Sequence, residues 1–223
     1  MTKIWHTCDD LVIGLGEIGK PILELLKERG LDAHGYDITD GELPNYKVNI
    51  IHICFPYNDD FIQQVKDYKQ RLKPEHIIIH STVNPGTSFE LDCVYSPVRG
   101  IHENMLEDLK FYKKYYAGPI DNDIMKRRFN EVYIVDDRTK LEWTKIIVDT
   151  TYWGYIIAFR KMIDQKYNVD WSFAEEINLN HRNRPIPYND QKPIGGHCVI
   201  PNLKFLQQDL YSEKIKELIE EFK

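Results

Sequence analysis

Short apolar runs alternate with amphipathic segments over residues 10–135 of this chain. Val48 to Phe55 and Ile77 to His80 are almost continuously apolar, which predicts strands covered on both faces of a parallel sheet. The segment from Asp59 to Arg71 between them predicts a helix. Further short strands are predicted at residues 10–13, 31–36, 94–95, 115–118 and 132–135. This alternation predicts an α/β fold with a doubly wound parallel sheet.

The pattern changes near Asp136. From Lys140 to Tyr167 the chain has no proline and only one glycine, Gly154, which predicts one long helix. Its apolar residues cover more than one helix face: Leu141, Ile147, Val148, Tyr152, Tyr155, Ile156, Phe159 and Ile163. Such a helix requires burial on several sides, within its own domain or against a second copy of the chain. We therefore expect a symmetric homodimer formed through this helix.

A small helical segment is predicted beyond the long helix. Trp171 to Leu179 predicts another helix, and His181 to Pro193 is a basic loop interrupted by prolines. Leu203 to Lys223 predicts a charged amphipathic helix on the outside of the protein.

Glycines mark the end of the first strand. Gly14, Gly16 and Gly19 form a Gly-x-Gly-x-x-Gly turn that leads into an amphipathic segment. Gly14 permits the tight turn, Gly16 lets the backbone approach a pyrophosphate, and Gly19 lets the helix pack closely on its strand. The phosphates would bind amides at the positive end of the helix. The turn residues expected to contact the cofactor are Gly14, Gly16, Glu17, Ile18 and Gly19.

A carboxylate follows the second predicted strand. Asp37 lies about 20 residues past the glycines, where a side chain can accept hydrogen bonds from both hydroxyls of an adenosine ribose. It would repel a 2′-phosphate, and no arginine follows it directly, so NAD is expected rather than NADP. An ordinary glycine-rich turn is the alternative interpretation. The sequence thus predicts a Rossmann-type NAD-binding domain over residues 1–137, followed by a helical segment over residues 138–223.

Composition narrows the function classes. The chain has 223 residues and a formal net charge of −6, which gives no sign of a nucleic-acid-binding surface. Its four cysteines lack metal-ligand spacing, so we expect neither a metal site nor a disulfide framework. No apolar run is long enough to cross a membrane, and the first residues lack a signal-peptide core. The expected location is the cytoplasm.

Six segments, taken in order, resemble the UDP-glucose/GDP-mannose dehydrogenase family. They are the turn Gly14 to Pro21, the strand end His52 to Pro56, Ser81 to Thr87, Ser96 to Gly100, Glu142 to Lys145, and Gly195 to Cys198. The likeness extends to Asn202 and is closest to the branch that oxidises UDP-N-acetylhexosamines such as UDP-N-acetylmannosamine.

The resemblance implies positions for the cofactor and the substrate. Pro56 would lie near the adenine side of NAD, and Ser81 and Thr82 near the nicotinamide ribose. The charged loop residues His181, Arg182 and Arg184 would bind a diphosphate, in the same or in the neighbouring subunit.

The resemblance also implies a reaction. A primary alcohol is oxidised twice by NAD to a carboxylate, through a thiohemiacetal and a thioester on a cysteine. Cys198 would be this nucleophile. Lys145, with Asp149 four residues later on the helix, would stabilise the developing alkoxide or act as acid and base.

Each of these residues has a simpler interpretation. Lys145 and Asp149 are also compatible with a surface ion pair, Cys198 with a small buried hydrophobe, and Ser81 with closure of a turn. The charged loop is also compatible with a solvated loop.

Several positions depart from the family pattern. The glutamate after Ser-Pro is Val98 here, the asparagine four residues past the lysine is Asp149, and the aspartate after the cysteine motif is Asn202. The loop between the second and third strands is shorter than usual. A complete member also continues into a second nucleotide-binding domain that grips UDP, and Leu203 to Lys223 shows no counterpart.

These departures keep several functions open. The leading one is an NAD-dependent oxidoreductase resembling a minimal nucleotide-sugar dehydrogenase. A single-step alcohol dehydrogenase, in the manner of the 3-hydroxyacid dehydrogenases, is the enzymatic alternative. The other alternative is an NAD-binding module whose catalysis has lapsed or depends on a separate partner chain.

Overall fold

The computed structural model describes residues 6–43, 46–100, 102–167, 202–206 and 210–221. By contact density the chain forms two compact units, Met1–Trp143 and Thr144–Lys223. Each unit is described by itself.

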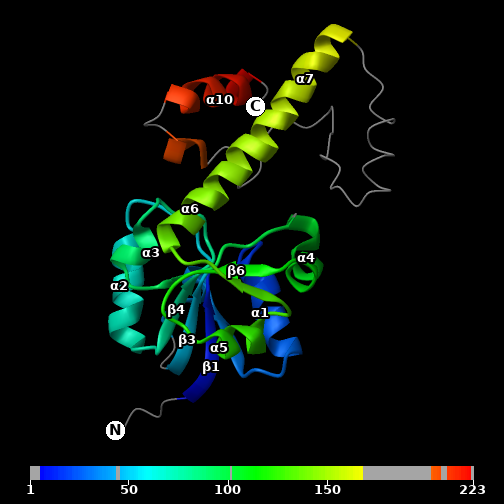
Figure 1. Ribbon diagram of the computed structural model, residues 1–223. Helices are drawn as coiled ribbons and strands as arrows, with labels where there is room; N and C mark the ends of the chain where they lie inside the picture. Colours follow the sequence, from blue (N-terminus) through cyan, green and yellow to red (C-terminus); the bar gives the residue numbers. More distant parts are fainter. Residues whose placement is uncertain (1–5, 44–45, 101, 168–201, 207–209, 222–223) are drawn as a thin grey trace. The chain divides into compact units, whose positions relative to one another are not determined.

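A five-stranded sheet forms the centre of the first unit (Figure 1). Its strands run in the order β2-β1-β3-β4-β5, and all neighbouring pairs are parallel. In chain order they are β1 His6–Ile13, β2 Ala33–Tyr36, β3 Tyr46–Ile53, β4 His76–Ile79 and β5 Val94–Tyr95. The strand order reverses between β1 and β3, and ligands bind at the carboxyl ends of the strands at such a point. The predicted Rossmann-like α/β fold is confirmed.

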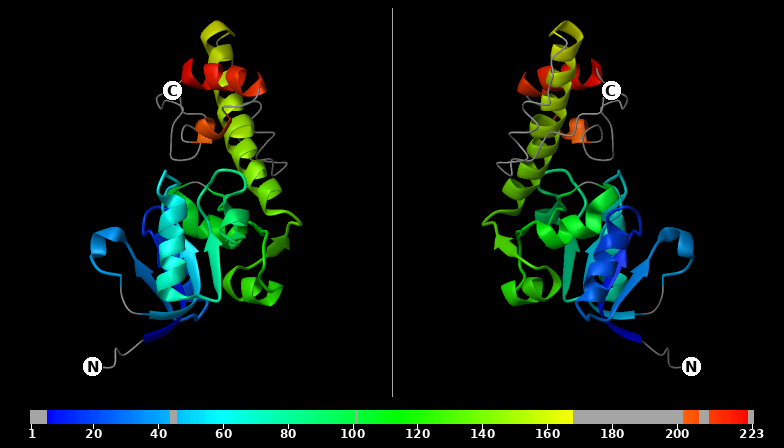
Figure 2. Two further views of the ribbon diagram at one scale, coloured as in Figure 1. Left: turned by 90° about the vertical axis from the view of Figure 1, so that its left-hand side faces the viewer. Right: turned by 90° about the vertical axis from the view of Figure 1, so that its right-hand side faces the viewer.

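Helices cover both faces of this sheet (Figures 1 and 2). One face packs against α1 Gly19–Glu28, α4 Met105–Phe111 and α5 Asn122–Arg128, and the other against α2 Phe61–Leu72. Helical spacing explains the two layers. In α1 the residues Ile22, Leu25 and Leu26 are buried, and in α2 the residues Phe61, Val65 and Leu72 are buried. The short helix α3, Thr87–Glu90, follows β4.

The last two predicted strands form a separate sheet. β6 Lys114–Tyr116 pairs in parallel with β7 Val132–Ile134. The chain after β6 meets β5 through one antiparallel bridge, Tyr95 to Ala117, so β6 does not extend the parallel ladder. The structure therefore confirms both strands but corrects their place in the sheet.

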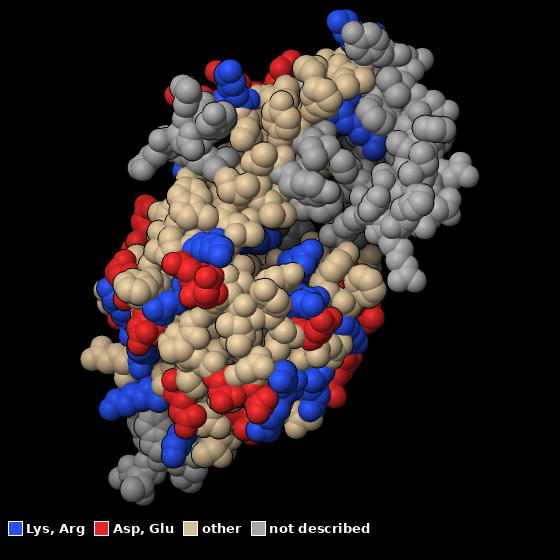
Figure 3. Space-filling model, in the orientation of Figure 1, with Lys and Arg blue, Asp and Glu red and all other residues tan. Residues whose placement is uncertain are grey.

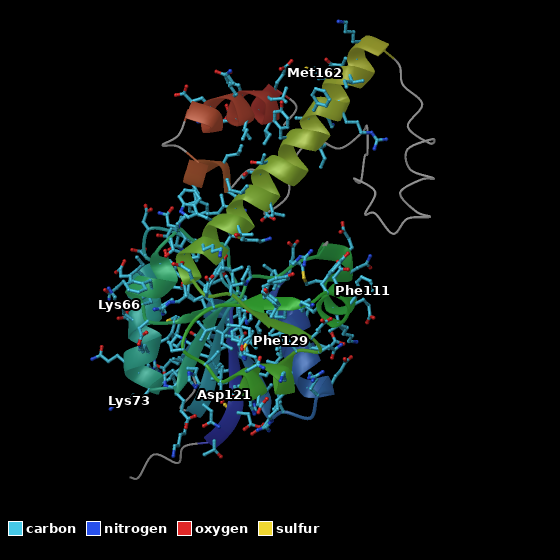
Figure 4. All side chains as sticks on the ribbon, in the orientation of Figure 1. Lys66, Lys73, Phe111, Asp121, Phe129 and Met162 are labelled. Carbon is cyan, nitrogen blue, oxygen red and sulfur yellow. The ribbon has the colours of Figure 1, made fainter. Side chains whose placement is uncertain are left out.

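The long helix is confirmed, with a feature that the sequence did not reveal. It consists of α6 Arg138–Ile147, a π-helical segment η3 Val148–Tyr155, and α7 Ile156–Tyr167. π-helical turns are rare and are frequently found at functional sites. Six large apolar side chains of this helix remain 37–44% exposed: Trp143, Ile147, Val148, Tyr155, Phe159 and Met162, the last of which is labelled in Figure 4.

A second hydrophobic core holds the second unit together. It consists of Ile146, Ala158, Leu203 and Ile219. Ile219 belongs to α10 Leu210–Glu221, so this part of the predicted amphipathic helix buries its apolar face. The predicted helix at 171–179 and the basic loop at 181–193 lie outside the described residues.

Charge is mixed over the first unit. On the face shown in Figure 3, lysine and arginine alternate with aspartate and glutamate. Among the described residues, no helix has the length and apolar character needed to span a bilayer. In the same part of the chain, no group of three histidine, cysteine or acidic side chains is placed to ligate a metal ion.

Candidate functional site

Two glycines of the turn after β1 are required by the packing of the chain itself. Gly14 has a φ of +91°, and a Cβ atom there would lie 2.7 Å from the backbone nitrogen of Phe55. A Cβ atom on Gly19 would lie 1.8 Å from the carbonyl oxygen of Gly14. Gly16 differs, because no atom lies within 4 Å of the position its Cβ would take. The space beside Gly16 is therefore open to a ligand.

The N-terminus of α1 is suited to an anion. Its N-cap residue, Ile18, makes no side-chain capping hydrogen bond, and the first turn contains no acidic residue. The amides of a first helical turn lack partners within the helix, and the helix dipole is positive there. Together with the open space beside Gly16, this end of α1 fits the pyrophosphate of a dinucleotide.

Asp37 lies directly after β2 and is fastened to the glycine turn. Its Oδ2 accepts a hydrogen bond from the amide of Leu15 at 2.8 Å, and its Oδ1 accepts from the amide and hydroxyl of Thr39 at 3.3 and 3.1 Å. These bonds, that of Leu15 foremost, lower the pKa of the Asp37 carboxyl, so it is ionised at neutral pH. A carboxylate can accept about four hydrogen bonds, and with these three made Asp37 still has room for a ribose hydroxyl.

Ile38, the residue after Asp37, has an exposed side chain that the sequence did not indicate. Ile38 is 78% exposed beside Asp37. A large apolar side chain with that exposure offers a flat ligand, such as a purine base, a surface to pack against. The sequence feature that could have pointed to Ile38 is its position directly after Asp37, the acidic residue that ends the second strand.

The loops after β3 and β4 complete this edge of the sheet. Pro56 is exposed just past β3, and Thr82 is half-buried. The Ser81 hydroxyl donates at 2.6 Å to the carbonyl oxygen of Phe55, which is 26 residues earlier, so it joins the two loops. The structure thus brings the glycine turn, Asp37, Pro56, Ser81 and Thr82 to one edge of the sheet.

Glu142 has a structural function that the sequence did not indicate. It is fully buried on α6, and its carboxylate accepts hydrogen bonds from the amides of Gly86 at 2.6 Å and Ser88 at 2.8 Å. Burial raises the pKa of this carboxyl, while the two amides act in the opposite direction. Glu142 therefore fixes the start of α6 to the loop that follows Ser81 and Thr82.

Lys145 and Asp149 form an ion pair with an Nζ to Oδ2 distance of 2.8 Å. Their side chains are only 12% and 8% exposed, which does not agree with a surface pair. Asn202 donates its amide to Asp149 Oδ2 at 3.1 Å and is itself buried. The two departures from the family pattern, Asp149 and Asn202, are thus hydrogen-bonded partners, and the trio still contains one lysine, one carboxylate and one amide.

Val98 is part of the apolar layer, with 5% exposure among residues of α4 and α5. Of the described cysteines, Cys8, Cys54 and Cys93 are buried, and burial is the main cause that raises the pKa of each thiol to about 12. They are therefore thiols at neutral pH and poor nucleophiles. The predicted nucleophile Cys198 and the predicted diphosphate ligands lie outside the described residues; those ligands are His181, Arg182 and Arg184.

No protein-family model matches the chain, and no curated protein matches its sequence. Solved structures do resemble it. The UDP-D-ManNAc dehydrogenase from Pyrococcus horikoshii aligns with a TM-score of 0.73 at 16% identity, over 96% of this chain and 69% of that one. Psf3 in complex with NADP⁺ and 2-OPP gives 0.69 at 14% identity, over 95% and 93%. The 3-hydroxyisobutyrate dehydrogenase (ygbJ) from Salmonella typhimurium gives 0.64 at 13% identity, over 98% and 93%. At these identities the likeness shows a shared fold, which is found in dehydrogenases.

Proposed function

We propose that this protein is a nicotinamide-dependent oxidoreductase that oxidises the hydroxyl group of a small molecule. The observation that carries the proposal is the glycine turn, whose open Gly16 and uncapped helix end adjoin an ionised Asp37 hydrogen-bonded to the turn itself. The dehydrogenases among its structural neighbours support the same class of reaction.

NAD is the proposed cofactor. When bound, it supplies the acceptor for the hydride. The amides at the start of α1 hold the pyrophosphate, and the Asp37 carboxylate accepts a hydrogen bond from the adenosine ribose. Because a 2′-phosphate would bring negative charge next to the Asp37 carboxylate, this end of the site favours NAD over NADP, although one neighbour, Psf3, was solved with NADP⁺.

Lys145 is the proposed acid–base residue. Lys145 Nζ is ion-paired with the Asp149 carboxylate, and the Asn202 amide donates to that carboxylate and fixes its orientation. An ammonium group held in this way stabilises an alkoxide that forms as the substrate hydroxyl loses its proton.

A nucleotide sugar is the proposed substrate class, with Cys198 capturing an aldehyde for a second oxidation. The motifs around Lys145 and Cys198 and the Pyrococcus neighbour support it. A single oxidation of a smaller hydroxy acid is the second candidate. It is favoured by Val98, which places a buried apolar side chain where hydrolysis of a thioester would use a carboxylate.

The experiment is a measurement of NADH formed per substrate consumed, with UDP-sugars, GDP-sugars and 3-hydroxy acids as substrates. Two equivalents with a nucleotide sugar support the double oxidation, and one equivalent with a hydroxy acid supports the second candidate. If NAD binds but no substrate is oxidised, the oxidoreductase proposal is wrong and the chain is a binding module. Cys198→Ser separates the two reactions, because only the double oxidation needs the thiolate.

We also propose that the long helix forms a homodimer. Its exposed apolar side chains, which include Tyr155 and Phe159, cover a helix face that a second copy would bury. Light scattering at micromolar concentration tests this: the wild type should be dimeric and Phe159→Glu monomeric. A monomeric wild type would contradict the proposal.

A further inference from the structure

Arg99 has an unusual environment in the loop that follows β5. Its guanidinium carbon lies 5.2 Å from the ring centroid of Tyr112 and 5.7 Å from that of Tyr115. Ring faces attract the delocalised cation but leave its five N–H groups, which lie in the guanidinium plane, available. Within the described part of the chain, none of these N–H groups donates to a protein acceptor. Arg71 and Arg128 differ, since both donate to protein oxygen atoms.

Hydrogen bonds from β6 hold the loop that carries Arg99. Lys114, which is 4% exposed, donates from Nζ to the carbonyl oxygens of Ser96 at 2.8 Å and Pro97 at 2.9 Å. In return the Ser96 hydroxyl donates to the carbonyl oxygen of Tyr115 at 2.9 Å. The strand that supplies a stacking ring for Arg99 therefore also holds the backbone before it. Such preorganisation lowers the entropic cost of binding a ligand.

Lys114 is in turn held by a chain of buried polar groups. His80 Nε2 lies 2.9 Å from His52 Nδ1, His52 Nε2 lies 2.7 Å from Asp10 Oδ1, and Arg128 donates to both oxygens of Asp10. Burial lowers the pKa of both histidines, and the cationic Lys114 lowers it further, so both are neutral.

His80 also contacts the loop that carries Arg99 directly. Its Nδ1 lies 2.7 Å from the carbonyl oxygen of Ser96 and 3.2 Å from Lys114 Nζ. The Ser96 carbonyl oxygen therefore has both the Lys114 and the His80 side chains within hydrogen-bond distance. At the other end of the chain, hydrogen bonds to His52 and Arg128 outweigh burial and lower the pKa of Asp10, so Asp10 is ionised.

An aromatic side chain encloses this part of the core. Phe129, labelled in Figure 4, lies with its ring centroid 5.2 Å from Lys114 Nζ and 6.0 Å from the His80 ring. With water excluded in this way, the lysine position is well defined.

The position of Arg99 in the fold is that of a ligand-binding residue. It follows the carboxyl end of β5, the edge of an open α/β sheet where ligands bind. A shallow hollow beside it is lined by three basic side chains, Arg99, Lys113 and Lys114, and by one acidic side chain, Asp108. Lys113 is also paired with Glu131 at 2.7 Å.

We propose that Arg99 binds an oxyanion, a phosphate or carboxylate group of the substrate, and that Lys114 is the positioning residue that holds the Arg99 loop. A planar fork of N–H groups matches both anions bidentately. That the anion belongs to the substrate rests on the proposed oxidoreductase function. That Arg99 binds an oxyanion does not.

The test is an NMR titration of the full chain with saturating NAD present, so that the pyrophosphate position at α1 is filled. Inorganic phosphate and acetate are added in separate arms, and the backbone amides of Arg99 and Gly100 are followed. The arm that shifts these amides identifies the anion class. Arg99→Met should weaken that anion at least about tenfold, and Arg99→Lys by a smaller factor, because lysine keeps the charge but loses the fork. Arg127→Met, at an exposed arginine of α5, is the matched control and should change nothing.

Two results would overturn the proposal: neither anion shifting these amides, or Arg99→Met binding as the wild type does. The amide shifts of Arg99 and Gly100 report on this loop alone, so they remain a valid test if NAD fails to bind. Failure of NAD to bind would count against the proposed function and not against anion binding by Arg99.

The positioning function of Lys114 needs a separate readout. Lys114→Met should weaken the anion about as much as Arg99→Met while NAD affinity stays unchanged. If Lys114→Met does not fold, His80→Gln, which removes the contacts of the His80 ring with Lys114 and with the Ser96 carbonyl oxygen while the two lysine–carbonyl bonds remain, should weaken the anion by a smaller factor. Unchanged anion affinity in a folded variant would refute the function of Lys114.

Discussion

The buried pair His52 and His80 should make the first unit sensitive to acid. Both side chains are inaccessible to solvent, and burial is the first cause that lowers their pKa from the ordinary value of 6.5, well below it for His80. When the chain unfolds, both imidazoles regain ordinary basicity. As the pH falls below that value, the unfolded state takes up protons that the folded state does not. Stability is therefore present above pH 6.5 and is lost as the pH decreases.

The magnitude follows from this linkage. Between about pH 7.5 and about pH 5, one histidine that stays neutral in the folded state removes roughly 2 kcal/mol of unfolding free energy, and two remove at most about 4 kcal/mol. Asp10 adds nothing in this window, because its pKa is lowered from 3.8. Glu142, whose pKa is raised from 4.5, acts in the opposite sense and only toward the acidic end. The expected loss is a large fraction of the stability of an ordinary domain.

Urea denaturation, followed by circular dichroism at a series of pH values, measures this loss. Hydrogen exchange of the β1 and β3 amides assigns it to the first unit. His52→Gln and His80→Gln should each remove about half of the pH dependence, whatever their effect on absolute stability. His34→Gln is the control: this side chain is 42% exposed and lies 3.0 Å from Asp32, and its replacement should remove less of the pH dependence than either buried histidine does. A loss below about 1 kcal/mol over this range in the wild type would refute the reasoning.

Three further predictions concern the two sites. Asp37→Ala should weaken NAD roughly tenfold or more by calorimetry and affect NADP less, whereas equal losses would contradict a ribose contact. Gly19→Ala should destabilise the chain by about 3 kcal/mol or more in thermal unfolding, because its Cβ would meet the Gly14 carbonyl oxygen. Gly16→Ala, which has open space around its Cβ position, should leave the stability unchanged and weaken only the binding of NAD. Asn202→Ala should lower kcat with little effect on NAD affinity, and a variant with wild-type kcat would show that the amide does not orient Asp149.

Local patterns in the sequence were enough for much of the fold and for one end of the site. The spacing of apolar residues predicted the strands and helices. A strand covered on both faces is apolar at almost every position, whereas an amphipathic helix is apolar at every third or fourth position, so a few residues distinguish the two. The glycine turn followed from backbone requirements at Gly14 and Gly19, which a single residue type satisfies. Asp37 followed from its distance along the chain.

The burial of polar residues did not follow from any local pattern. Lys145 and Asp149 have the same four-residue spacing in a surface pair and in a buried one, and only the packing of Asn202, 53 residues further on, distinguishes the two. The π-helical segment within the long helix likewise has no signature in the spacing of its side chains.

The sequence by itself therefore determined the class of fold, the glycine turn and its acidic partner, because these depend on neighbours in the chain. Tertiary structure alone decided the chain from Lys114 to Asp10. Its links join residues 28, 42 and 118 positions apart, on strands whose register brings them together. A buried ionisable side chain is stable only when such distant partners satisfy it, and those partners are chosen by the packing of the whole sheet.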